Sequence, residues 1–308
     1  MKKEILFRME SPFRDTFQII SYRFGSGHKS LAIVGQMRGD EVHQLYVCSQ
    51  LVNRLKQLEQ EGKLLPDHEI LVIPSANPFS MNIGKRFWAM DNTDINRMFP
   101  GYDKGETTQR IAAALFGELQ GYDYGVQMAS FYIPGDFIPH VRIIRTGYED
   151  VETASLFGLP YISLRQPLPF DTTLLNYNWQ IWETKAFSIY GGQNKEVEGK
   201  TTTQIVQATL RFMQRIGALK RFPVGVADFR SEVMDAADLL SIKTPCAGIL
   251  YRLKGAGSEV QEGELIARII DPYEGHVTAE ITAPRQGLIF YAANQPLTLQ
   301  HTTLFKMI

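Results

Sequence analysis

The sequence predicts an α/β protein with a mixed, mainly parallel sheet flanked by helices, followed by a small all-β module. Strand patterns alternate with amphipathic helix patterns through roughly the first 220 residues, which is typical of a sheet covered on both faces. From about residue 236, short strands and turn residues replace the helices. The length of 308 residues is sufficient for one large domain and one small one.

Hydrophobic periodicity predicts the individual elements of the first part. Continuous apolar runs predict strands at residues 31–34, 69–74, 124–128 and 161–164. Apolar positions near 3.6-residue spacing predict helices at residues 45–61, 107–119 and 204–216. Thr107 or Thr108 is expected to cap the second helix. Residues 24–27 are expected to form a hairpin turn, because the spacing of a phosphate-binding loop is absent.

Composition excludes several classes of protein. Hydrophobic residues make up 44% of the chain, charged residues 21%, and the net charge is −1, so no nucleic-acid partner and no membrane partner are expected. No apolar run approaches 18 residues, and no secretory signal opens the chain. Cys48 and Cys246 lie far apart, which argues against a disulfide framework. These observations favour a cytoplasmic location.

The C-terminal part contains an internal repeat. Residues 244–251 and 283–290 share a Pro-x-x-Gly pattern, and residues 257–265 read Gly-x-x-Val-x-x-Gly-x-Leu. This arrangement resembles the barrel-sandwich module of lipoyl and biotinyl domains, but the lysine that such carriers present for modification is absent. We expect an α/β domain at residues 1–230 and a β barrel-sandwich module at residues 236–308 that packs beside it.

A sharp turn follows the first predicted α/β strand. It reads Arg38-Gly39-Asp40-Glu41 and leads into a helix. Ligands of open α/β sheets gather at such strand ends. The turn resembles the His-Gly-Asp-Glu turn of carboxypeptidase-type zinc hydrolases, in which the histidine and the glutamate bind the metal. Glu41 keeps the carboxylate, whereas Arg38 is a permanent cation with no lone pair for a metal.

Further motifs narrow the resemblance. Residues 94–101 read Asp-Ile-Asn-Arg-Met-Phe-Pro-Gly, and Asn77-Pro78 and Arg86 precede them at suitable distances. This pattern is similar to the Asp-Leu-Asn-Arg-x-Phe-Pro-Gly segment of the succinylglutamate desuccinylase/aspartoacylase family. That family often carries a barrel-sandwich tail as well. The resemblance covers nearly the whole chain and implies a zinc carboxypeptidase-like fold.

The resemblance also indicates what has replaced the family's catalytic metal site. Arg38 falls at the first zinc histidine, Ala129 at the second, and Gln127 at the aspartate before it. Tyr190 falls at the general-base glutamate. Only Glu41 is retained as a ligand. Because catalytic zinc needs three protein ligands to generate a hydroxide, no cofactor is expected at this site, and proton transfer lacks its base.

The substrate-binding half of the family's site is retained. Asn96 and Arg97 match substrate-binding positions, and Arg86 matches the position that contacts the substrate carbonyl or oxyanion. Forked guanidinium groups suit carboxylates, so a ligand role is favoured. The alternative is that both arginines form structural salt bridges with Asp91 and Asp94.

Two hypotheses concern the charge of Glu41. In the first, Arg38 replaces the metal electrostatically through a bidentate pair with Glu41, because an unpaired buried carboxylate is costly. In the second, a relocated metal is held by Glu41, His43, Asp136 and His140. The plainer expectation is that His43 lies on the outside of a helix and that His140 hydrogen-bonds in a loop.

Three functions are consistent with these residues. The chain is a non-catalytic relative of the deacylases that binds a carboxylate-bearing small molecule of the N-acyl amino acid type. It is then expected to form a homo-oligomer, or to act beside an active paralogue. Alternatively, it is an active metal-dependent amide hydrolase with zinc on non-standard ligands, or a structural scaffold whose pocket Arg38 and Tyr190 close. Whether it is an enzyme is therefore left open.

Overall fold

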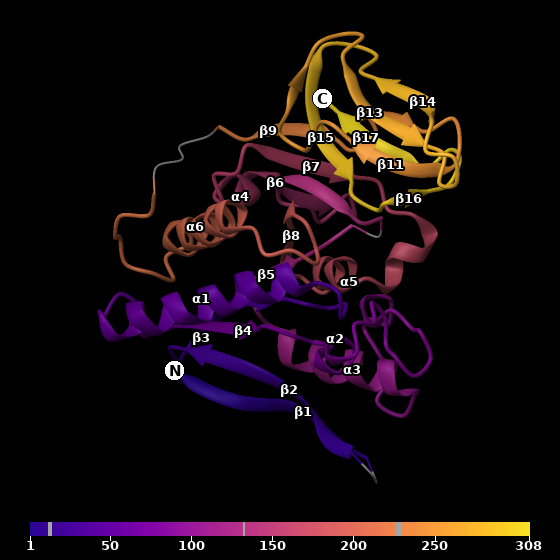
Figure 1. Cartoon of the computed structure of the whole chain (residues 1–308). Coiled ribbons are helices and arrows are strands. Elements are labelled where there is room, and N and C mark those ends of the chain that lie inside the picture. The colour runs from indigo at the N-terminus through magenta and orange to yellow at the C-terminus, as the bar shows by residue number, and fades with distance from the viewer. Residues whose placement is uncertain (12–13, 132, 226–229) are drawn as a thin grey trace.

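One large mixed sheet runs through the molecule, and a smaller sheet packs at its C-terminal end (Figure 1). The computed structural model describes residues 1–11, 14–131, 133–225 and 230–308. In spatial order, the strands of the large sheet are β1 (Lys2–Ser11), β2 (Arg14–Phe24), β4 (His68–Ile73), β3 (His28–Val34), β5 (Tyr124–Met128), β8 (Lys185–Gly192), β6 (Gly135–Ile144), β15 (Gly287–Ala293), β17 (Thr303–Met307) and β10 (Leu240–Lys243). Branching from this path are β7 (Tyr161–Arg165), β9 (Glu232–Asp235) and β12 (Glu259–Val260).

The prediction of a mixed sheet is confirmed. The central strands β4, β3, β5 and β8 are parallel. Parallel pairing also joins β6 to β7 and β7 to β9. The N-terminal hairpin, the β6–β8 pair and the C-terminal strands are antiparallel, so antiparallel pairs outnumber parallel ones among the described strands, unlike the mainly parallel sheet that was predicted.

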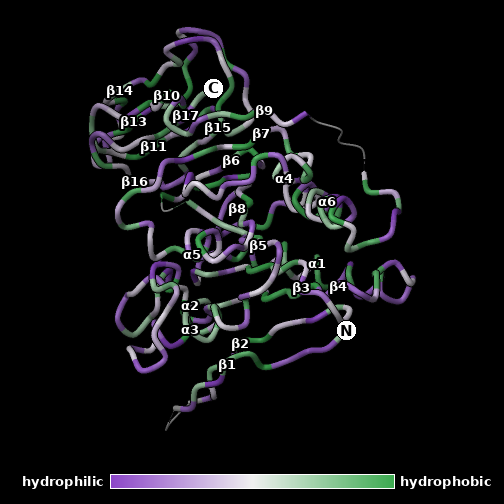
Figure 2. The backbone as a smooth tube through the Cα atoms, turned by 180° about the vertical axis from the view of Figure 1, so that it is seen from behind, coloured by the Kyte–Doolittle hydropathy of each residue, from purple (hydrophilic) through white to green (hydrophobic). Residues whose placement is uncertain are grey.

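Helices cover both faces of this sheet. One face carries α1 (Val42–Gln60), α4 (Val151–Ser155) and α6 (Gly199–Arg215), and the other carries α2 (Pro78–Asn82), α3 (Thr107–Leu119) and α5 (Leu175–Ile181). Each face has its own apolar core. Figure 2 shows the hydrophobic stretches of strands such as β2 and β8. Within the described residues, no helix is long and apolar enough to cross a membrane.

The predicted helices and strands are present, with shifted ends. The second predicted helix begins at Thr107 as expected, but its N-cap is Glu106 and not Thr107 or Thr108. The Glu106 amide donates a hydrogen bond to Oε1 of Gln109, at 3.0 Å, which completes the first turn. The third predicted helix begins five residues earlier than expected, at Gly199.

Residues 24–27 do not form a hairpin turn. They join β2 to β3, and these two strands lie on opposite sides of β4 in the sheet. Both edges of β3 are paired, one with β4 and the other with β5, so β2 pairs with the far edge of β4 and not with β3. The prediction was wrong because a local turn pattern does not specify which strand is the neighbour.

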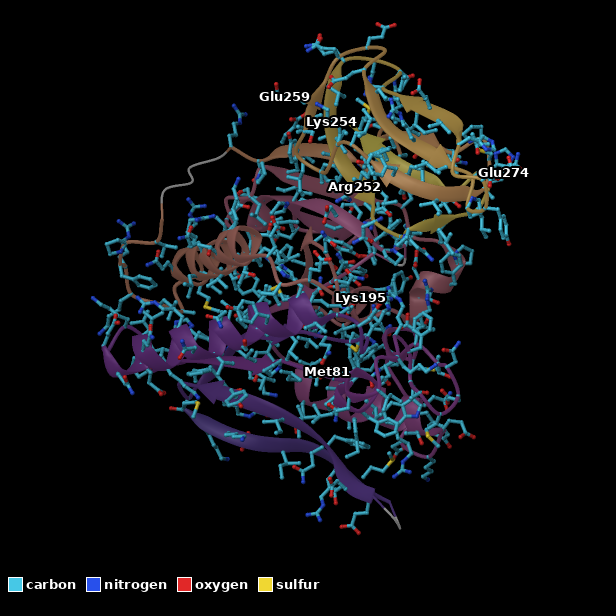
Figure 3. All side chains as sticks on the ribbon, viewed as in Figure 1. Met81, Lys195, Arg252, Lys254, Glu259 and Glu274 are labelled. Atoms are coloured by element: carbon cyan, nitrogen blue, oxygen red, sulfur yellow. The ribbon has the colours of Figure 1, made fainter. Side chains whose placement is uncertain are left out.

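The C-terminal module adds a four-stranded sheet with the order β14 (Val277–Thr282), β13 (Leu265–Ile270), β11 (Gly248–Arg252) and β16 (Leu297–Thr298). The repeat places β11 in this sheet and β15 in the large one. The side chains of Glu259 and Glu274 project outward from the module (Figure 3). The two domain boundaries stay a prediction, and residues 226–229 beside them lie outside the described part of the chain.

Candidate functional site

The turn after β3 is packed tightly against the segment that follows α2. A Cβ atom on Gly39 would lie 2.2 Å from the Lys85 carbonyl oxygen, so only glycine fits there. The Gly39 amide also donates a hydrogen bond to the Arg86 carbonyl, at 2.8 Å. This packing buries Arg38 and Glu41, which are 7% and 0% exposed.

Glu41 is a buried carboxylate with three hydrogen-bond donors. Its Oε2 accepts from the Arg38 backbone amide at 3.0 Å. Its Oε1 accepts from Nη1 of Arg38 at 3.2 Å and from the hydroxyl of Ser130 at 2.5 Å. The predicted Arg38–Glu41 pair therefore forms. It is not bidentate as expected, because Nε and Nη2 of Arg38 face Asp94.

The fork of Arg38 engages a different carboxylate, that of Asp94. Nε and Nη2 of Arg38 lie 3.0 and 2.8 Å from Oδ2 of Asp94. Burial alone would lower the pKa of Arg38, but the attraction of Asp94 and Glu41 raises it above its ordinary value. The guanidinium is therefore a fixed positive charge between two buried carboxylates.

A cavity of about 440 Å³ opens beside this charge cluster, beyond the carboxyl ends of β5 and β8. Six of the residues predicted for the site line it: Arg38, Asn96, Arg97, Gln127, Ala129 and Tyr190. Arg38 and Tyr190 line the cavity and do not close it. The remaining lining residues are Ser130, Phe131, Arg142, Ile144, Arg165, Leu168, Phe170, Asp171, Leu174, Asn176, Ser188 and Lys306.

A short 3-10 turn, η1 (Ile95–Arg97), presents two of these residues. Asp94 caps it by accepting a hydrogen bond from the Asn96 amide at 3.1 Å. The side-chain oxygen of Asn96 is buried and has no hydrogen-bond partner among the described residues. Arg97 lies over the ring of Phe170 at 4.9 Å, donates to its carbonyl oxygen, and keeps only a long contact of 4.0 Å with Asp94.

A polar row crosses the sheet at the base of the cavity. Gln127 on β5 is opposite Ser188 on β8, and Ser188 is opposite Arg142 on β6. Asn176 of α5 donates to Gln127 and Ser188 at 2.7 and 2.8 Å. The row positions Arg142 at the cavity, because residues opposite one another on neighbouring strands share a face.

Arg142, Arg165 and Lys306 line this cavity but were not identified from the sequence, and two of them, Arg142 and Lys306, lie near aromatic rings. The guanidinium of Arg142 lies 5.8 Å from the ring centre of Phe131 and 5.3 Å from that of Tyr190. The ammonium of Lys306, on β17, lies 5.9 Å from the same Phe131 ring. No local pattern marks either residue, because each reaches the cavity through pairing between distant strands.

The segment that carries Arg38, Asn96 and Arg97 matches a known protein family. Residues 27–128 match the succinylglutamate desuccinylase/aspartoacylase catalytic domain. Residues 27–128 belong to that family. The match contains the Arg38 turn, the 94–101 motif and β5, so the resemblance seen in the sequence is confirmed.

Relatives of known sequence or structure agree with the family assignment. The N-alpha-acetyl-L-2,4-diaminobutyric acid deacetylase of Halomonas elongata is 24% identical over 277 residues, which are 86% of this chain and 77% of the relative. A succinylglutamate desuccinylase structure from a Silicibacter species has a TM-score of 0.79 at 17% identity, covering 99% and 94% of the two chains. The product-bound ectoine utilization protein EutE (DoeB) of Ruegeria pomeroyi has a TM-score of 0.73 at 18% identity, covering 95% and 89%. These structures share the fold.

The residues present do not fit the zinc ion that the family implies. Glu41 is the one metal ligand that the resemblance implies to be retained, and its oxygens accept hydrogen bonds from Arg38 and Ser130. Ala129 lies at the cavity wall with a methyl group where the second histidine is expected. In the part of the chain that the structure describes, no three His, Cys, Asp or Glu side chains come together as a metal site.

The relocated metal site is not assembled either. His43 is buried in the first turn of α1 and not on its outside, because Nδ1 accepts a hydrogen bond from the Glu198 amide at 3.4 Å. Burial lowers the pKa of His43. Asp136 instead forms an ion pair with Arg252, at 3.1 Å.

Tyr190, at the general-base position, is held by aromatic contacts. Its ring stacks on His140 with centres 5.4 Å apart. His140 lies in strand β6 and not in a loop, and its Nδ1 contacts the Ile138 carbonyl oxygen at 2.8 Å. Burial lowers the pKa of His140 to about 3, so the ring is neutral at ordinary pH.

Arg86 lies beside the site but does not line the cavity. Its Nη1 contacts both oxygens of Asp40 at 2.9 and 2.8 Å, and its Nη2 donates to the Phe131 carbonyl at 3.0 Å. Asp40 follows Gly39 in the turn, so Arg86 ties the turn to the strand end after β5. The expected salt-bridge partners, Asp91 and Asp94, are not the ones observed. Its predicted role at a substrate carbonyl stays a prediction.

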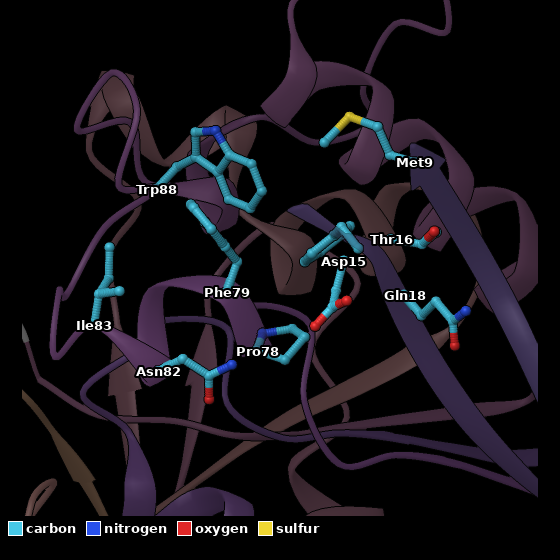
Figure 4. A pocket seen from close by; sticks show the side chains of 10 residues that line it. Met9, Asp15, Thr16, Gln18, Pro78, Phe79, Asn82, Ile83 and Trp88 are labelled. Carbon is cyan, nitrogen blue, oxygen red and sulfur yellow. The ribbon is translucent and has the colours of Figure 1, made fainter. Parts of the chain in front are cut away.

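A second cavity, of about 360 Å³, lies between β2 and α2 (Figure 4). Aromatic side chains form much of its wall: Trp88 lies 5.3 Å from the ring centres of both Phe17 and Phe79. Asp15 is the charged side chain of its lining. None of the residues predicted for the site lines this cavity.

Proposed function

We propose that this protein binds a carboxylate-bearing small molecule of the N-acyl amino acid type without zinc-dependent hydrolysis. The observation that carries the proposal is the Arg38 guanidinium, which is paired with Asp94 and Glu41 where the family resemblance implies a metal. On this proposal, the guanidinium supplies the positive charge that a metal would supply, but it cannot activate a water molecule.

Groups at the cavity suit the two functional parts of such a ligand. Arg97 is 37% exposed at its side chain, and its guanidinium can take a carboxylate. The unpartnered oxygen of Asn96 can accept a hydrogen bond from the ligand's amide N–H. A volume of about 440 Å³ accommodates a small molecule of this class.

Release of the acyl group is not supported by these residues. Amide hydrolysis at neutral pH needs an activated water and a base to move its proton. Tyr190 presents a phenol at the base position, and Ala129 presents a methyl group at a ligand position. We therefore propose that the bound molecule is retained intact, and that the chain works as a homo-oligomer or as the binding subunit beside an active relative.

Calorimetric titration tests the binding. N-succinyl-L-glutamate and N-acetyl amino acids are titrated into the wild type, into Arg97→Ala, and into Arg110→Ala as an exposed control on α3. We expect a saturable carboxylate ligand whose affinity falls about tenfold or more in Arg97→Ala and is unchanged in the control. If no carboxylate binds the wild type, the proposal is wrong.

Metal analysis tests the lack of hydrolysis. Protein purified without chelator is expected to carry far less than one zinc per chain and to leave every titrated amide intact. One tightly held zinc per chain, together with amine release that a chelator abolishes, would instead establish the alternative of an active amide hydrolase with non-standard ligands.

A further inference from the structure

The cavity between β2 and α2 is separate from the site described above. Its volume of about 360 Å³ suits a small molecule, and none of its lining residues lines the cavity beside Arg38. Asp15, Phe79 and Trp88 lie around it (Figure 4). The proposed function assigns no role to these side chains, so the cavity requires an explanation of its own.

Aromatic rings form one wall of this cavity. They belong to Phe17 of β2, Phe79 of α2 and Trp88 in the segment that follows α2. The Trp88 ring is inclined at 85° to the ring of Phe17 and at 43° to the ring of Phe79. Because the faces of aromatic rings attract cations, a cavity lined by rings at different angles suits an ammonium group.

Local hydrogen bonds hold this aromatic wall in place. Asn77 caps α2, because its side-chain oxygen accepts from the Ser80 amide at 3.2 Å. The Trp88 amide donates to the Thr93 carbonyl, and the Asn92 amide donates to the Trp88 carbonyl, both at 2.8 Å. A wall that is already ordered loses little conformational entropy when a ligand binds.

Asp15 gives the cavity a negative charge. It is the one charged side chain among the lining residues, and Thr16, Gln18 and Asn82 are neutral polar ones. Within the described part of the chain, no cation pairs with the Asp15 carboxylate. An organic cation would neutralise this carboxylate and could place its apolar part against the rings, whereas an anion would be repelled.

We propose that this cavity binds an organic cation, a substituted ammonium ion with an apolar substituent. The ammonium group lies between the Asp15 carboxylate and the aromatic wall, and the apolar substituent packs against Phe79 and Trp88. The charge of this ligand is opposite to that of the carboxylate proposed for the cavity beside Arg38. The two sites therefore bind different classes of molecule.

Matched probes test the charge of the ligand. Choline and 3,3-dimethylbutan-1-ol have nearly the same shape, but the alcohol has a carbon atom in place of the charged nitrogen. In calorimetric titrations of the wild type, we expect choline to bind about tenfold tighter than the alcohol or more. Benzyltrimethylammonium should bind more tightly than choline, because its phenyl ring adds apolar contact with the wall.

Substitutions locate the site. Asp15→Asn keeps the shape of the side chain and removes its charge, so the affinity for benzyltrimethylammonium should fall about tenfold or more. Phe79→Leu keeps an apolar side chain without a ring and should weaken binding severalfold; thermal melting checks that this variant is folded. Asp103→Asn changes an exposed carboxylate outside the lining and should bind as the wild type does.

Three results would overturn the proposal. If neither cation binds the wild type, the cavity is not a site for organic cations. If the alcohol binds as tightly as choline, or if Asp15→Asn binds the cations as the wild type does, the cavity does not select for positive charge. Because the two cavities share no lining residue, Asp15→Asn should leave carboxylate binding unchanged, so this test is independent of the proposed function.

Discussion

At the scale of single residues, Arg38 determines the chemistry of the site. It has two buried carboxylate partners, Glu41 and Asp94, and a raised pKa. The residue types at positions 38, 129 and 190 could be compared with the family from sequence alone. The pairing of Arg38 with Asp94 could not be predicted in this way, because the two residues lie 56 positions apart in the chain.

Replacing Arg38 by an uncharged residue of similar length should destabilise the fold. In Arg38→Met, Glu41 remains buried without a cation and Asp94 keeps only the long contact with Arg97. Loss of one member of a buried ion pair costs about 3–5 kcal/mol. Urea denaturation measures the free energy of unfolding. Arg110→Met, at an exposed position of α3, should change it by less than about 0.5 kcal/mol. Equal stability of the two variants would contradict this account.

Restoring the family's ligands should restore metal binding. In Arg38→His combined with Ala129→His, Glu41 regains two imidazole neighbours and the cation that occupied its oxygen is gone. We expect near-stoichiometric zinc by elemental analysis of the double variant at micromolar protein. Each single variant should retain little zinc. Adding Glu41→Gln to the double variant should abolish binding; zinc retained without that carboxylate would show that the ion lies elsewhere.

At the scale of elements, the N-terminal hairpin is an addition at the edge of the sheet that the sequence patterns did not reveal. β2 pairs with β4 and buries Phe17 against Trp88, whereas Ile5 on β1 is 54% exposed. The alternating strands of a hairpin produce a weaker sequence signal than the continuous apolar runs of β3 and β4.

The hairpin offers a matched pair of substitutions. Phe17→Ala should lower the free energy of unfolding by about 3 kcal/mol, because a buried aromatic ring leaves a cavity when it is removed. Ile5→Ala on the neighbouring strand should have an effect below about 0.5 kcal/mol. Urea denaturation followed by tryptophan fluorescence measures both. An equally large loss of unfolding free energy in Ile5→Ala would mean that another surface covers β1 in solution.

At the scale of the whole molecule, stability should fall in acid because His140 is buried as a neutral ring. Its pKa is about 3 in the folded protein and near 6.5 when unfolded, so the unfolded chain binds a proton that the folded chain does not. The free energy of unfolding is therefore lost as pH falls from 6.5 towards 3. His43, whose pKa is also lowered, contributes in the same direction.

His140→Gln should reduce this acid sensitivity. Between pH 7 and pH 4.5, the wild type should lose roughly 2 kcal/mol more stability than the variant, since each pH unit below the unfolded pKa costs up to about 1.4 kcal/mol. Urea midpoints at both values measure the difference. His276→Gln changes a histidine that is exposed at 58% of its side chain and should retain the wild-type slope. If stability depends on pH equally in all three proteins, the acid sensitivity does not come from the burial of His140.

The sequence by itself determined the alternation of strands and helices, the turn at residues 38–41, the 94–101 motif and the residue types at positions 38, 129 and 190. These are local properties: periodicity, turn chemistry and residue type act within a few positions of the chain. Only the tertiary structure decided that Arg38 pairs with Asp94, that Arg86 pairs with Asp40, and that Lys306 reaches the cavity. Such contacts depend on the order and register of strands far apart in the chain, which a pattern confined to one element does not specify.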